Sequence, residues 1–493
     1  MKSNVRVRFA PSPTGYPHLG NIRTALFNWL FARHTNGTFI VRIEDTDITR
    51  KVEGATESML EGLRWLGLNW DEGPECGGDF GPYFQSQRLD TYHKIAQQLV
   101  DEGYAYKCYC STQRLQEMRE EQKKNSVPTG YDRRCRDLTQ EECAAQESKG
   151  ITPVIRFKFP REGETRFNDL IRGEVVFQNS ILDDFVLLKS DGYPTYHLAN
   201  IVDDHLMQIS HVLRADEWLS STPRHIQLYN AMGYEPPIFA HLPIILGPDR
   251  AKLSKRHGAT SVLEYRDLGY LSEALVNFLS LLGWSLDDKT EIIPIADIVD
   301  HFSLERVGKT GAVFNHDKLE WMNGVYMRAL THEQFTARAM PFVEKGLSAE
   351  IKRPLSQDYL LHIAPLVQDR VKLLKDTPEL VEFFFTDNLT YDYNMLLGKN
   401  MTWSGVFTAL EKTLQKLQNM AEFDTESMEQ TIRPMTEELN LKTSQYFGVL
   451  RVATTGRAAA PPLFQTMAVL GKEKCLTRIA QALTIASSKV TES

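Results

Sequence analysis

Two segments far apart in the chain carry residue types suited to holding nucleotide phosphates. The first, residues 8–21, reads RFAPSPTGYPHLGN and is crowded with proline and glycine. The second, residues 252–256, reads KLSKR and is strongly basic. Phosphate displacement needs a cradle for the phosphates and cations on the leaving pyrophosphate. We therefore expect one nucleotide site assembled from these two distant pieces.

The first segment has the composition of a phosphate-binding turn. Residues 5–9 alternate apolar and basic side chains, which predicts a strand, and apolar residues from Ile22 onward fall on one helical face. A turn that opens onto a helix N-terminus offers free N–H groups and a positive dipole to an anion. Thr14, His18 and the backbone as far as Gly20 are predicted to form the cradle, with His18 donating hydrogen bonds to phosphate oxygens. The alternative is a capped turn with an incidental histidine.

The second segment supplies the cations. Lys252 and Lys255 are flexible point charges suited to a leaving pyrophosphate. Taken alone, such a run is most often a solvated loop, so the prediction depends on its partner segment. Two other nucleotide motifs are excluded: residues 307–310 (VGKT) resemble the end of a P-loop, but Ser303 stands where that motif needs glycine, and no Gly-x-Gly-x-x-Gly follows the first strand.

The N-terminal part of the chain, which must position these residues, is predicted to form a βαβ unit. Residues 38–43 predict a second strand after the helix, and Glu44-Asp45-Thr46-Asp47 follows it at the edge where parallel sheets bind ligands. This rhythm is lost in the next hundred residues and returns near Tyr193, and the last third is largely helical. The predicted regions are 1–80 and 191–250 (two halves of one α/β domain), 81–190 (an insertion), 251–330 (the region that begins with the basic loop) and 331–493 (a helical region).

Composition limits the class of protein. The chain has 493 residues, of which 42% are hydrophobic and 24% charged, as in soluble globular proteins. The first residues resemble no signal peptide and no stretch is apolar enough for a membrane span, so a cytoplasmic protein without membrane contact is expected. The formal net charge is −8, yet residues 441–493 hold seven Lys or Arg against two acids. This basic end suits phosphate contacts or is a solvated helix face.

A group of cysteines predicts a metal site. Three of the six cysteines crowd a short window, and thiolates with a carboxylate suit a tetrahedral, structural Zn²⁺. The predicted ligands are Cys108, Cys110, Cys135 and Asp137. Tyr131, a water or Cys143 are alternatives for the fourth position, and three reduced thiols without metal are the alternative to the whole site.

Taken together, these motifs resemble the bacterial-type glutamyl-tRNA synthetases, which are class I aminoacyl-tRNA synthetases. Residues 8–20 resemble the HIGH region of that family, residues 43–47 (IEDTD) one of its signatures and residues 252–256 its KMSKS loop. Further similar runs are 193–200 (YPTYHLAN), 203–205 (DDH), 214–218 (RADEW) and 314–324. The departures are Asn21 at the second His of HIGH, Leu253 and Arg256 in the KMSKS element, and Asp137 where the family more often has histidine.

The resemblance implies a fold and a set of site residues. The fold would be α/β, with a Rossmann-type parallel-sheet catalytic domain, an α+β insertion and an all-α C-terminal anticodon-binding region. The implied glutamate pocket is Arg8, Ala10, Ser12, Glu44, Tyr196, Asn200 and Arg214. The implied ATP-binding residues are His18, Gly20, Glu217, Leu242 and Lys255, and the residues expected to act in catalysis are Thr14, His18, Lys252 and Lys255. A guanidinium suits the γ-carboxylate because it offers two parallel donors, which neutral glutamine satisfies poorly.

The resemblance also implies the reaction and the partners. Glutamate would be activated with ATP and Mg²⁺ to glutamyl-adenylate and then transferred to tRNA(Glu), and the enzyme would act as a monomer. The resemblance leaves two alternatives for the first step, one that requires bound tRNA and one that does not. The insertion would hold the tRNA acceptor end, and the C-terminal region would read the anticodon, with Arg370, Lys372 and Arg457 as candidate contacts.

Several alternatives remain at this stage. A relaxed form would also load glutamate onto tRNA(Gln). A non-catalytic tRNA-binding paralogue should have lost His18, Lys255 or the pocket arginines, and all are present. A transferase acting on an anticodon base would lack residues 330–493, and an unrelated nucleotidyltransferase would have no reason to carry residues 193–200.

Overall fold

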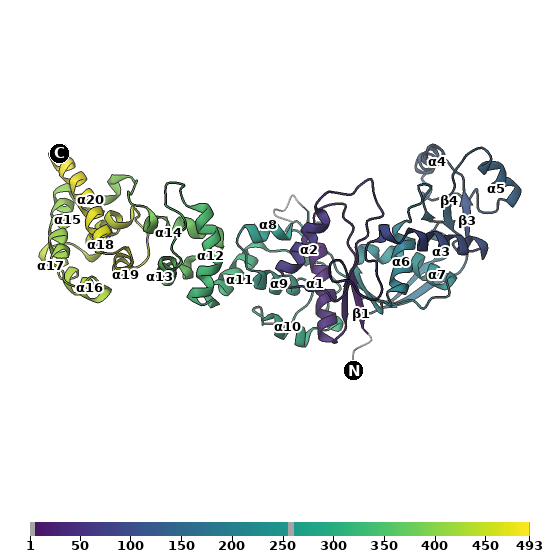
Figure 1. Cartoon of the computed structure of the whole chain (residues 1–493), viewed down its shortest axis with the longest axis horizontal. Helices are drawn as coiled ribbons and strands as arrows, with labels where there is room; N and C mark the ends of the chain where they lie inside the picture. Colours follow the sequence, from purple (N-terminus) through teal and green to yellow (C-terminus); the bar gives the residue numbers. More distant parts are fainter. Residues whose placement is uncertain (1–4, 255–260, 493) are drawn as a thin grey trace. The chain divides into compact units, whose positions relative to one another are not determined.

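The structure is a computed structural model that describes residues 5–254 and 261–492, and the chain divides into two compact units (Figure 1). Unit 1 comprises Met1–Arg266 and Ser272–Leu319, and unit 2 comprises Asp267–Leu271 and Glu320–Ser493. Within the described ranges, no helix combines the length and the apolar character needed to cross a membrane.

The centre of unit 1 is a parallel sheet built around β1 (Arg6–Phe9). On one side β1 pairs in parallel with β2 (Thr38–Val41). On the other side the backbone N–H of Ser210 donates to the carbonyl of the first β1 residue at 3.0 Å, which places β8 (His211–Ala215) beside β1. β9 (Ile238–Leu242) then pairs in parallel with β8. These strands are buried almost throughout, as expected for parallel strands covered on both faces, although β1 and β8 carry Arg6, Arg8 and Arg214.

Two helices bring the predicted site residues to this sheet. α1 (Leu19–His34) connects β1 to β2 and begins at the end of the proline-rich turn. α6 (Tyr196–Leu206) carries Tyr196, Asn200 and Asp204 four residues apart, so they share one helical face. That face lies over β1 and the end of β2, because Asp204 and Asn200 bond to Arg8 of β1 and Asp204 bonds to Arg42, the residue after β2. The predicted βαβ opening is thus present, with the helix starting three residues earlier than its apolar pattern indicates.

The region predicted as an insertion has two parts. Its first part is an antiparallel sheet in the order β3-β4-β7 with three helices. These elements are α3 (Leu89–Asp101), β3 (Ala105–Cys108), α4 (Thr112–Lys124), α5 (Gln140–Glu147), β4 (Val154–Phe157) and β7 (Val186–Leu188). Its second part, β5 (Glu164–Asp169) and β6 (Gly173–Gln178), extends the central sheet instead, because Asp169 pairs in parallel with Phe239 of β9. Residues 81–190 are therefore not wholly outside the catalytic sheet.

The remainder of unit 1 is mainly helical. Its elements are α2 (Ala55–Trp65), α7 (Thr222–Ala231), β10 (Ile245–Leu246), α8 (Val262–Asp267), α9 (Ser272–Leu281), α10 (Ile295–His301), β11 (Ala312–Val313) and the start of α11 (His316–Ala329). α1 packs against α9 and α10. Arg23 of α1 is buried in this layer and donates to the carbonyl oxygens of Leu282, at 3.1 Å, and Pro243. The helix is thereby tied to the segments that follow both β9 and α9.

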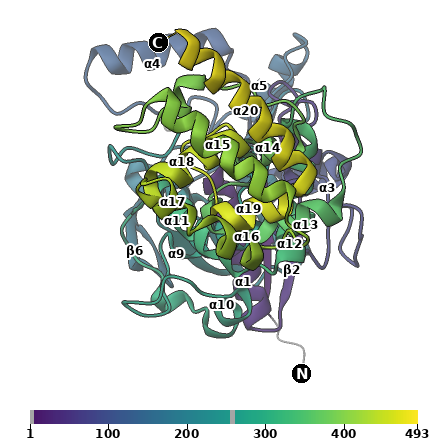
Figure 2. The same ribbon diagram turned by 90° about the vertical axis from the view of Figure 1, so that its left-hand side faces the viewer.

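The described part of unit 2 is a bundle of helices. They are α12 (His332–Gly346), α13 (Gln357–Val367), α14 (Thr377–Phe385), α15 (Trp403–Gln418), α16 (Thr425–Ile432), α17 (Met435–Glu438), α18 (Thr443–Thr455), α19 (Leu463–Leu470) and α20 (Lys472–Glu492). α15 and α20 lie side by side along much of their length (Figure 2). The predicted helical C-terminal third is present in these residues.

One buried arginine joins the ends of two of these helices. Arg478 of α20 is only 1% exposed. Its guanidinium donates to the carbonyl oxygens of Thr454 at 2.6 Å, near the end of α18, and of Phe383 and Thr386 at 2.7 and 2.5 Å, at the end of α14. Carbonyls in the last turn of a helix have no partner within the helix, so Arg478 satisfies groups that would otherwise be buried without hydrogen bonds.

Replacing Arg478 by methionine should destabilise unit 2. The change removes the donor to the carbonyls of Thr454 and Phe383, whereas the Thr386 carbonyl keeps a bond from Lys474 at 3.4 Å. We expect the free energy of unfolding to fall by about 3 kcal/mol. Urea unfolding followed by circular dichroism measures this, and hydrogen exchange should increase locally in residues 377–386 and 443–455. Gln481→Met, at an exposed position of the same helix, is the matched control. Equal effects of the two substitutions would show that the carbonyl contacts contribute no stability.

Candidate active site

A cavity of about 650 Å³ opens in unit 1 at the carboxyl ends of β1 and β8. It receives the turn before α1, the segment after β2, the first residue of α6 and the segment after β8. The predicted site residues that line it are Arg8, Ala10, Ser12, Thr14, His18, Glu44, Tyr196, Arg214 and Glu217. The structure therefore brings together side chains from segments that are more than two hundred residues apart in the chain.

Other predicted residues lie behind or beside this lining. Asn200 is 2% exposed, and its amide oxygen accepts hydrogen bonds from Arg8 at 3.1 Å and from Arg42 at 3.1 Å, so it lies beneath the cavity. Leu242 is fully buried at the end of β9 and does not line the cavity. Lys252 lies next to the lining, bonded to Glu217 at 2.5 Å. Lys255 lies outside the described residues.

The absence of a side chain at Gly20, the last of the residues predicted for this cavity, leaves space for the ring of His18. A Cβ atom at this position would come within 3.0 Å of two ring atoms of His18. Glycine in the first turn of α1 therefore lets the imidazole lie against the helix.

The floor of the cavity is a network of buried ion pairs. Asp204 accepts from Arg8 Nε at 3.0 Å and from Arg42 Nη1 at 2.7 Å, and Arg42 also donates to Glu44 at 3.0 Å. Arg8, Arg42 and Asp204 are all at most 4% exposed. Burial acts to raise the pKa of Asp204, but the two guanidinium groups hold it below its ordinary value. Asp204 therefore stays ionised and fixes both arginines.

A second buried carboxylate supports this floor from the side of the insertion. Asp203 accepts hydrogen bonds from Arg88 at 2.7 Å, from the Tyr92 hydroxyl at 2.8 Å and from Gln85 at 2.9 Å. Arg42 and Arg88 were missed at the level of sequence. A signal was available for Arg42, because an arginine inside an otherwise apolar, buried strand segment needs a partner nearby.

Glu44 is the carboxylate closest to changing its protonation state. Burial, opposed by Arg42, raises the pKa of Glu44 to about 7. A cation arriving in the cavity would favour the ionised form. Glu44 is therefore suited to accept hydrogen bonds from an ammonium group of a ligand.

His18 caps α1 at the mouth of the cavity. Its Nδ1 accepts the backbone N–H of Asn21 at 3.3 Å, so the proton of the neutral ring lies on Nε2. Desolvation and, next, the charge of Lys252 lower the pKa of His18. The ring is therefore a neutral donor whose Nε2–H is available for an anion, next to the amino group of Lys252.

Tyr196 and Arg214 form the opposite wall. Arg214, 5% exposed, donates to the Tyr196 hydroxyl at 3.2 Å. The Tyr196 ring lies against Trp218, with 4.3 Å between ring centroids. With Arg8, this wall offers the positive charge of two guanidinium groups and a hydroxyl, which suits a carboxylate ligand.

The cysteine group is in the first part of the insertion. The sulfur atoms of Cys108, Cys110 and Cys135 all lie within 4.8 Å of one another. The hydroxyl of Tyr131 lies 3.2 Å from Cys108 Sγ and 3.6 Å from Cys110 Sγ. Hydrogen bonds from Cys135 and from Tyr131 lower the pKa of Cys108. Three sulfurs at this spacing, one favouring the thiolate, fit the donor set of a tetrahedral zinc site.

The structure does not place Asp137 with these sulfurs. The Asp137 side chain is 73% exposed and lies 3.7 Å from Lys158 and 3.8 Å from Arg161. Lys158 and Arg161 neutralise the charge of this carboxylate, and the oxygen that lies beside the sulfurs is the Tyr131 hydroxyl. Cys143 is likewise outside the group of three sulfurs.

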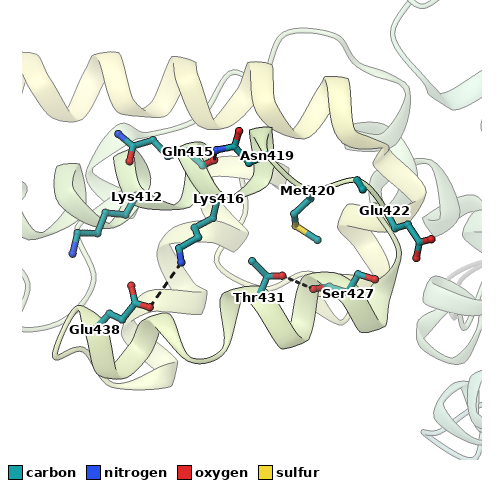
Figure 3. A pocket seen from close by; sticks show the side chains of 10 residues that line it. Lys412, Gln415, Lys416, Asn419, Met420, Glu422, Ser427, Thr431 and Glu438 are labelled. Carbon is teal, nitrogen blue, oxygen red and sulfur yellow. Dashed lines mark hydrogen bonds and ion pairs between the residues drawn. The ribbon is translucent and has the colours of Figure 1, made fainter.

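Unit 2 contains two further hollows. One, of about 810 Å³, lies between α15 and α16, and its lysines and acids are interspersed: Lys416 faces Glu438 across it at 4.0 Å (Figure 3). The other, of about 730 Å³, is lined by Arg457, which lies 3.8 Å from Glu382 and stacks over Phe383. The other two predicted anticodon contacts, Arg370 and Lys372, are exposed outside both hollows. Neither hollow gathers the kind of convergent charges found in unit 1.

Comparison with known proteins assigns the family. Residues 4–321 match the tRNA synthetases class I (E and Q), catalytic domain, and residues 334–483 match an anticodon binding domain. The chain is 59% identical to a glutamate--tRNA ligase of Dehalococcoides mccartyi, over 98% of each chain. It is 48% identical to a glutamate--tRNA ligase of Moorella thermoacetica, over 97% of this chain and 98% of that one.

Solved structures agree with this assignment. A crystal structure of a glutamate tRNA ligase from Elizabethkingia meningosepticum, in complex with its amino acid, superposes with a TM-score of 0.88. It is 36% identical in sequence, and the match covers 98% of this chain and 99% of that one. The parallel-sheet catalytic fold with a helical C-terminal unit, predicted from the sequence, is confirmed. The chain belongs to the class I tRNA synthetases of the glutamate and glutamine group.

Proposed function

We propose that this enzyme attaches glutamate to tRNA(Glu) in two steps that consume ATP. In the first, an oxygen of the α-carboxylate of glutamate attacks the α-phosphorus of ATP, and the bond to the β-phosphate oxygen breaks to release pyrophosphate. In the second, the 2′-hydroxyl of the terminal adenosine of the tRNA attacks the carbonyl of glutamyl-adenylate, and AMP leaves. The observation that carries the proposal is the single cavity that joins two arginines and Glu44 to the phosphate-binding turn.

The deep end of the cavity suits glutamate. Arg8 and Arg214 supply positive charge for the γ-carboxylate, and the Tyr196 hydroxyl adds a neutral donor. Glu44 accepts from the α-ammonium group, whose charge favours the ionised form of this carboxylate. Ala10 and Ser12 border the ligand, and Asn200 acts from below by holding Arg8.

The mouth of the cavity suits ATP. His18 Nε2–H and the N-terminus of α1 donate to phosphate oxygens, and Lys252 and Lys255 neutralise the leaving pyrophosphate. Thr14 adds a hydroxyl, Gly20 allows close approach of the backbone, and Glu217 and the backbone near Leu242 are proposed for the nucleoside. Mg²⁺ bound to ATP would neutralise further phosphate charge. Positioning and charge stabilisation suffice for this transfer, since no covalent intermediate with the protein is required.

The other regions are proposed to bind the tRNA. The insertion, residues 81–190, would hold the acceptor end, residues 251–330 would contact the stem, and residues 331–493 would read the anticodon. Arg457 is the anticodon candidate best supported by geometry, because it is the one of the three that lines a hollow. Arg370 and Lys372 are proposed as outer contacts. We propose further that the enzyme acts as a monomer in the cytoplasm.

We propose a structural Zn²⁺ in the insertion. Cys108, Cys110 and Cys135 would be three ligands, and the Tyr131 hydroxyl the fourth, because it is the oxygen that lies beside the sulfurs. The metal would tie the end of β3 to the segment that carries Cys135. It would take no part in the transfer reaction.

A non-catalytic paralogue is not favoured. The full-length relatives are named glutamate--tRNA ligases, and the predicted pocket and phosphate residues are all present. Charging of tRNA(Gln) with glutamate depends on how unit 2 reads the anticodon, so it is decided by the assay described next.

Purified enzyme should charge tRNA(Glu) with glutamate in the presence of ATP and Mg²⁺. The assay offers glutamate and glutamine separately to tRNA(Glu) and tRNA(Gln). We expect glutamate to be attached at least about a thousandfold more efficiently than glutamine, because the NH₂ group of an amide brings hydrogen atoms against the positively charged wall and the donating hydroxyl of Tyr196. Formation of glutamyl-tRNA(Gln) would identify a relaxed form. Absence of glutamate on both tRNAs would refute the proposed function.

His18→Ala should slow adenylate formation about a hundredfold, because it removes a donor to the developing phosphate charge. Binding of tRNA should be unchanged within about twofold, since His18 acts only at the phosphates. Pyrophosphate exchange, measured with tRNA present, and a tRNA binding titration give the two values. His301→Ala is the control, because His301 is exposed and its ring bonds only within its own helix. A parallel loss of exchange and of tRNA binding would contradict the assigned role.

Elemental analysis of enzyme purified without chelator should find about one equivalent of zinc. Cys110→Ser should lower the content below about 0.2 equivalents, because a hydroxyl binds zinc far less well than a thiolate. Cys143→Ser, outside the group of three sulfurs, should retain the metal. Less than about a tenth of an equivalent in the unmodified protein would exclude the site.

A further inference from the structure

The guanidinium of Arg214 is held by protein acceptors on all sides. Its five N–H groups point at five acceptors, four of them side-chain atoms. They are His241 Nε2 at 3.1 Å, His225 Nδ1 at 3.1 Å, the Tyr196 hydroxyl at 3.2 Å, Thr222 Oγ1 at 2.9 Å and the carbonyl oxygen of Trp218 at 3.5 Å. His225, His241 and Thr222 are fully buried. Such a complete set leaves this side chain a single orientation.

The direction of each hydrogen bond follows from the charge of arginine. A guanidinium only donates, so the nitrogen of His241 that faces Arg214 carries no proton. The proton of His241 is therefore on Nδ1, where it is donated to Asp169 at 2.6 Å. Asp169 is itself fixed by the backbone N–H groups of Ile171 and Arg172, at 3.0 and 2.8 Å. The orientation of Arg214 is thus set from β5, two strands away from β8.

The same argument fixes the proton positions of the second histidine that faces Arg214, His225. His225 Nδ1 accepts from Arg214, so the His225 proton is on Nε2 and is donated to His197 Nδ1 at 3.0 Å. Desolvation and, next, Arg224 lower the pKa of His197 to about 4, and desolvation and Arg214 lower the pKa of His225 well below its ordinary value. Both rings are neutral at neutral pH, so His225 can accept from the guanidinium and His197 can accept from His225.

This arrangement also determines what Tyr196 presents to the cavity. Its oxygen accepts from Arg214, so the hydroxyl proton must be donated elsewhere. Among the described residues none accepts it, and Tyr196 lines the cavity. A ligand atom facing Tyr196 and Arg214 therefore meets a donor backed by a cation. A carboxylate oxygen satisfies that donor, whereas the NH₂ group of an amide brings hydrogen atoms against it.

We propose that His241, His225 and Thr222, with Asp169 and His197 behind them, are positioning residues that hold Arg214 and so set the preference for glutamate over glutamine. The inference rests on the proposed function, because it assigns the discrimination of the same cavity to residues outside its lining. None of the five touches the reacting atoms, so their effect must appear in the amino-acid parameters and not in those of ATP.

Paired substitutions at Thr222 test the proposal with little change in packing. Thr222→Val keeps the shape and removes the acceptor for Arg214, whereas Thr222→Ser keeps the hydroxyl and removes a methyl group. In aminoacylation of tRNA(Glu), we expect Thr222→Val to raise the KM for glutamate about thirtyfold and to leave the KM for ATP within about twofold of the unmodified enzyme. The ratio of kcat/KM for glutamate to that for glutamine should fall about tenfold or more. Thr222→Ser should behave like the unmodified enzyme.

Two substitutions at His241 provide an independent test if a Thr222 variant fails to fold. His241→Phe removes both ring nitrogens, and His241→Gln returns an amide oxygen near the Nε2 position. We expect the Phe variant to repeat the selective rise in the glutamate KM and the Gln variant to recover most of the loss. Thermal unfolding of each variant separates stability from selectivity, because a merely structural role lowers the unfolding temperature without splitting the two KM values.

The outcomes are distinct. Unmodified enzyme that does not charge tRNA(Glu) refutes the proposed function. Active enzyme whose Thr222→Val and His241→Phe variants keep an unchanged glutamate KM, or lose glutamate and ATP affinity equally, refutes the positioning role alone. An unchanged ratio of glutamate to glutamine efficiency in these variants would equally overturn it.

Discussion

The pairing of buried charges beneath the cavity is the constraint on which the rest of unit 1 depends. Arg8, Arg42 and Asp204 come from β1, the end of β2 and α6, and all three are almost inaccessible to water. Burying an unpaired ion costs several kcal/mol, so these three elements must be in place together. The positions of the two strands and of the helix are therefore not independent. The cavity exists where the partners of these charges meet.

The same network leaves the cavity with an excess of positive charge. Asp204 is shared by Arg8 and Arg42, Asp203 is occupied mainly by Arg88, and Glu44 is only partly ionised because burial raises its pKa to about 7. Arg214 has no carboxylate partner among the described residues, since its acceptors are neutral. A dicarboxylic amino acid supplies the missing negative charge and adds an ammonium group that Glu44 can accept. Electrostatic preorganisation of this kind requires little rearrangement on binding.

The sequence predicted the lining of the cavity better than its support. Short motifs located the turn at residues 8–21, the acidic run after β2 and the start of α6, because proline, glycine and periodicity act locally. The support was missed, since the pairing of Asp169 with His241, or of Arg42 with Asp204, depends on strand order that no local pattern encodes. For the same reason, β5 and β6 were assigned to the insertion, and Asp137 was preferred to Tyr131 beside the cysteines.

The two ends of the cavity differ in rigidity, and the difference suits their tasks. At the glutamate end, Arg8 and Arg214 are buried and each is held by several fixed partners. Because these side chains cannot move to suit an amide, a ligand whose polar atoms do not match the site binds much more weakly than a carboxylate. At the phosphate end, the side chains of Lys252 and Glu217 are about half exposed and bond mainly to each other. An exposed ion pair contributes little to stability, so these side chains can exchange partners as pyrophosphate forms and leaves. The buried arginines therefore suit selection of the amino acid, and the exposed pair of Lys252 and Glu217 suits release of pyrophosphate.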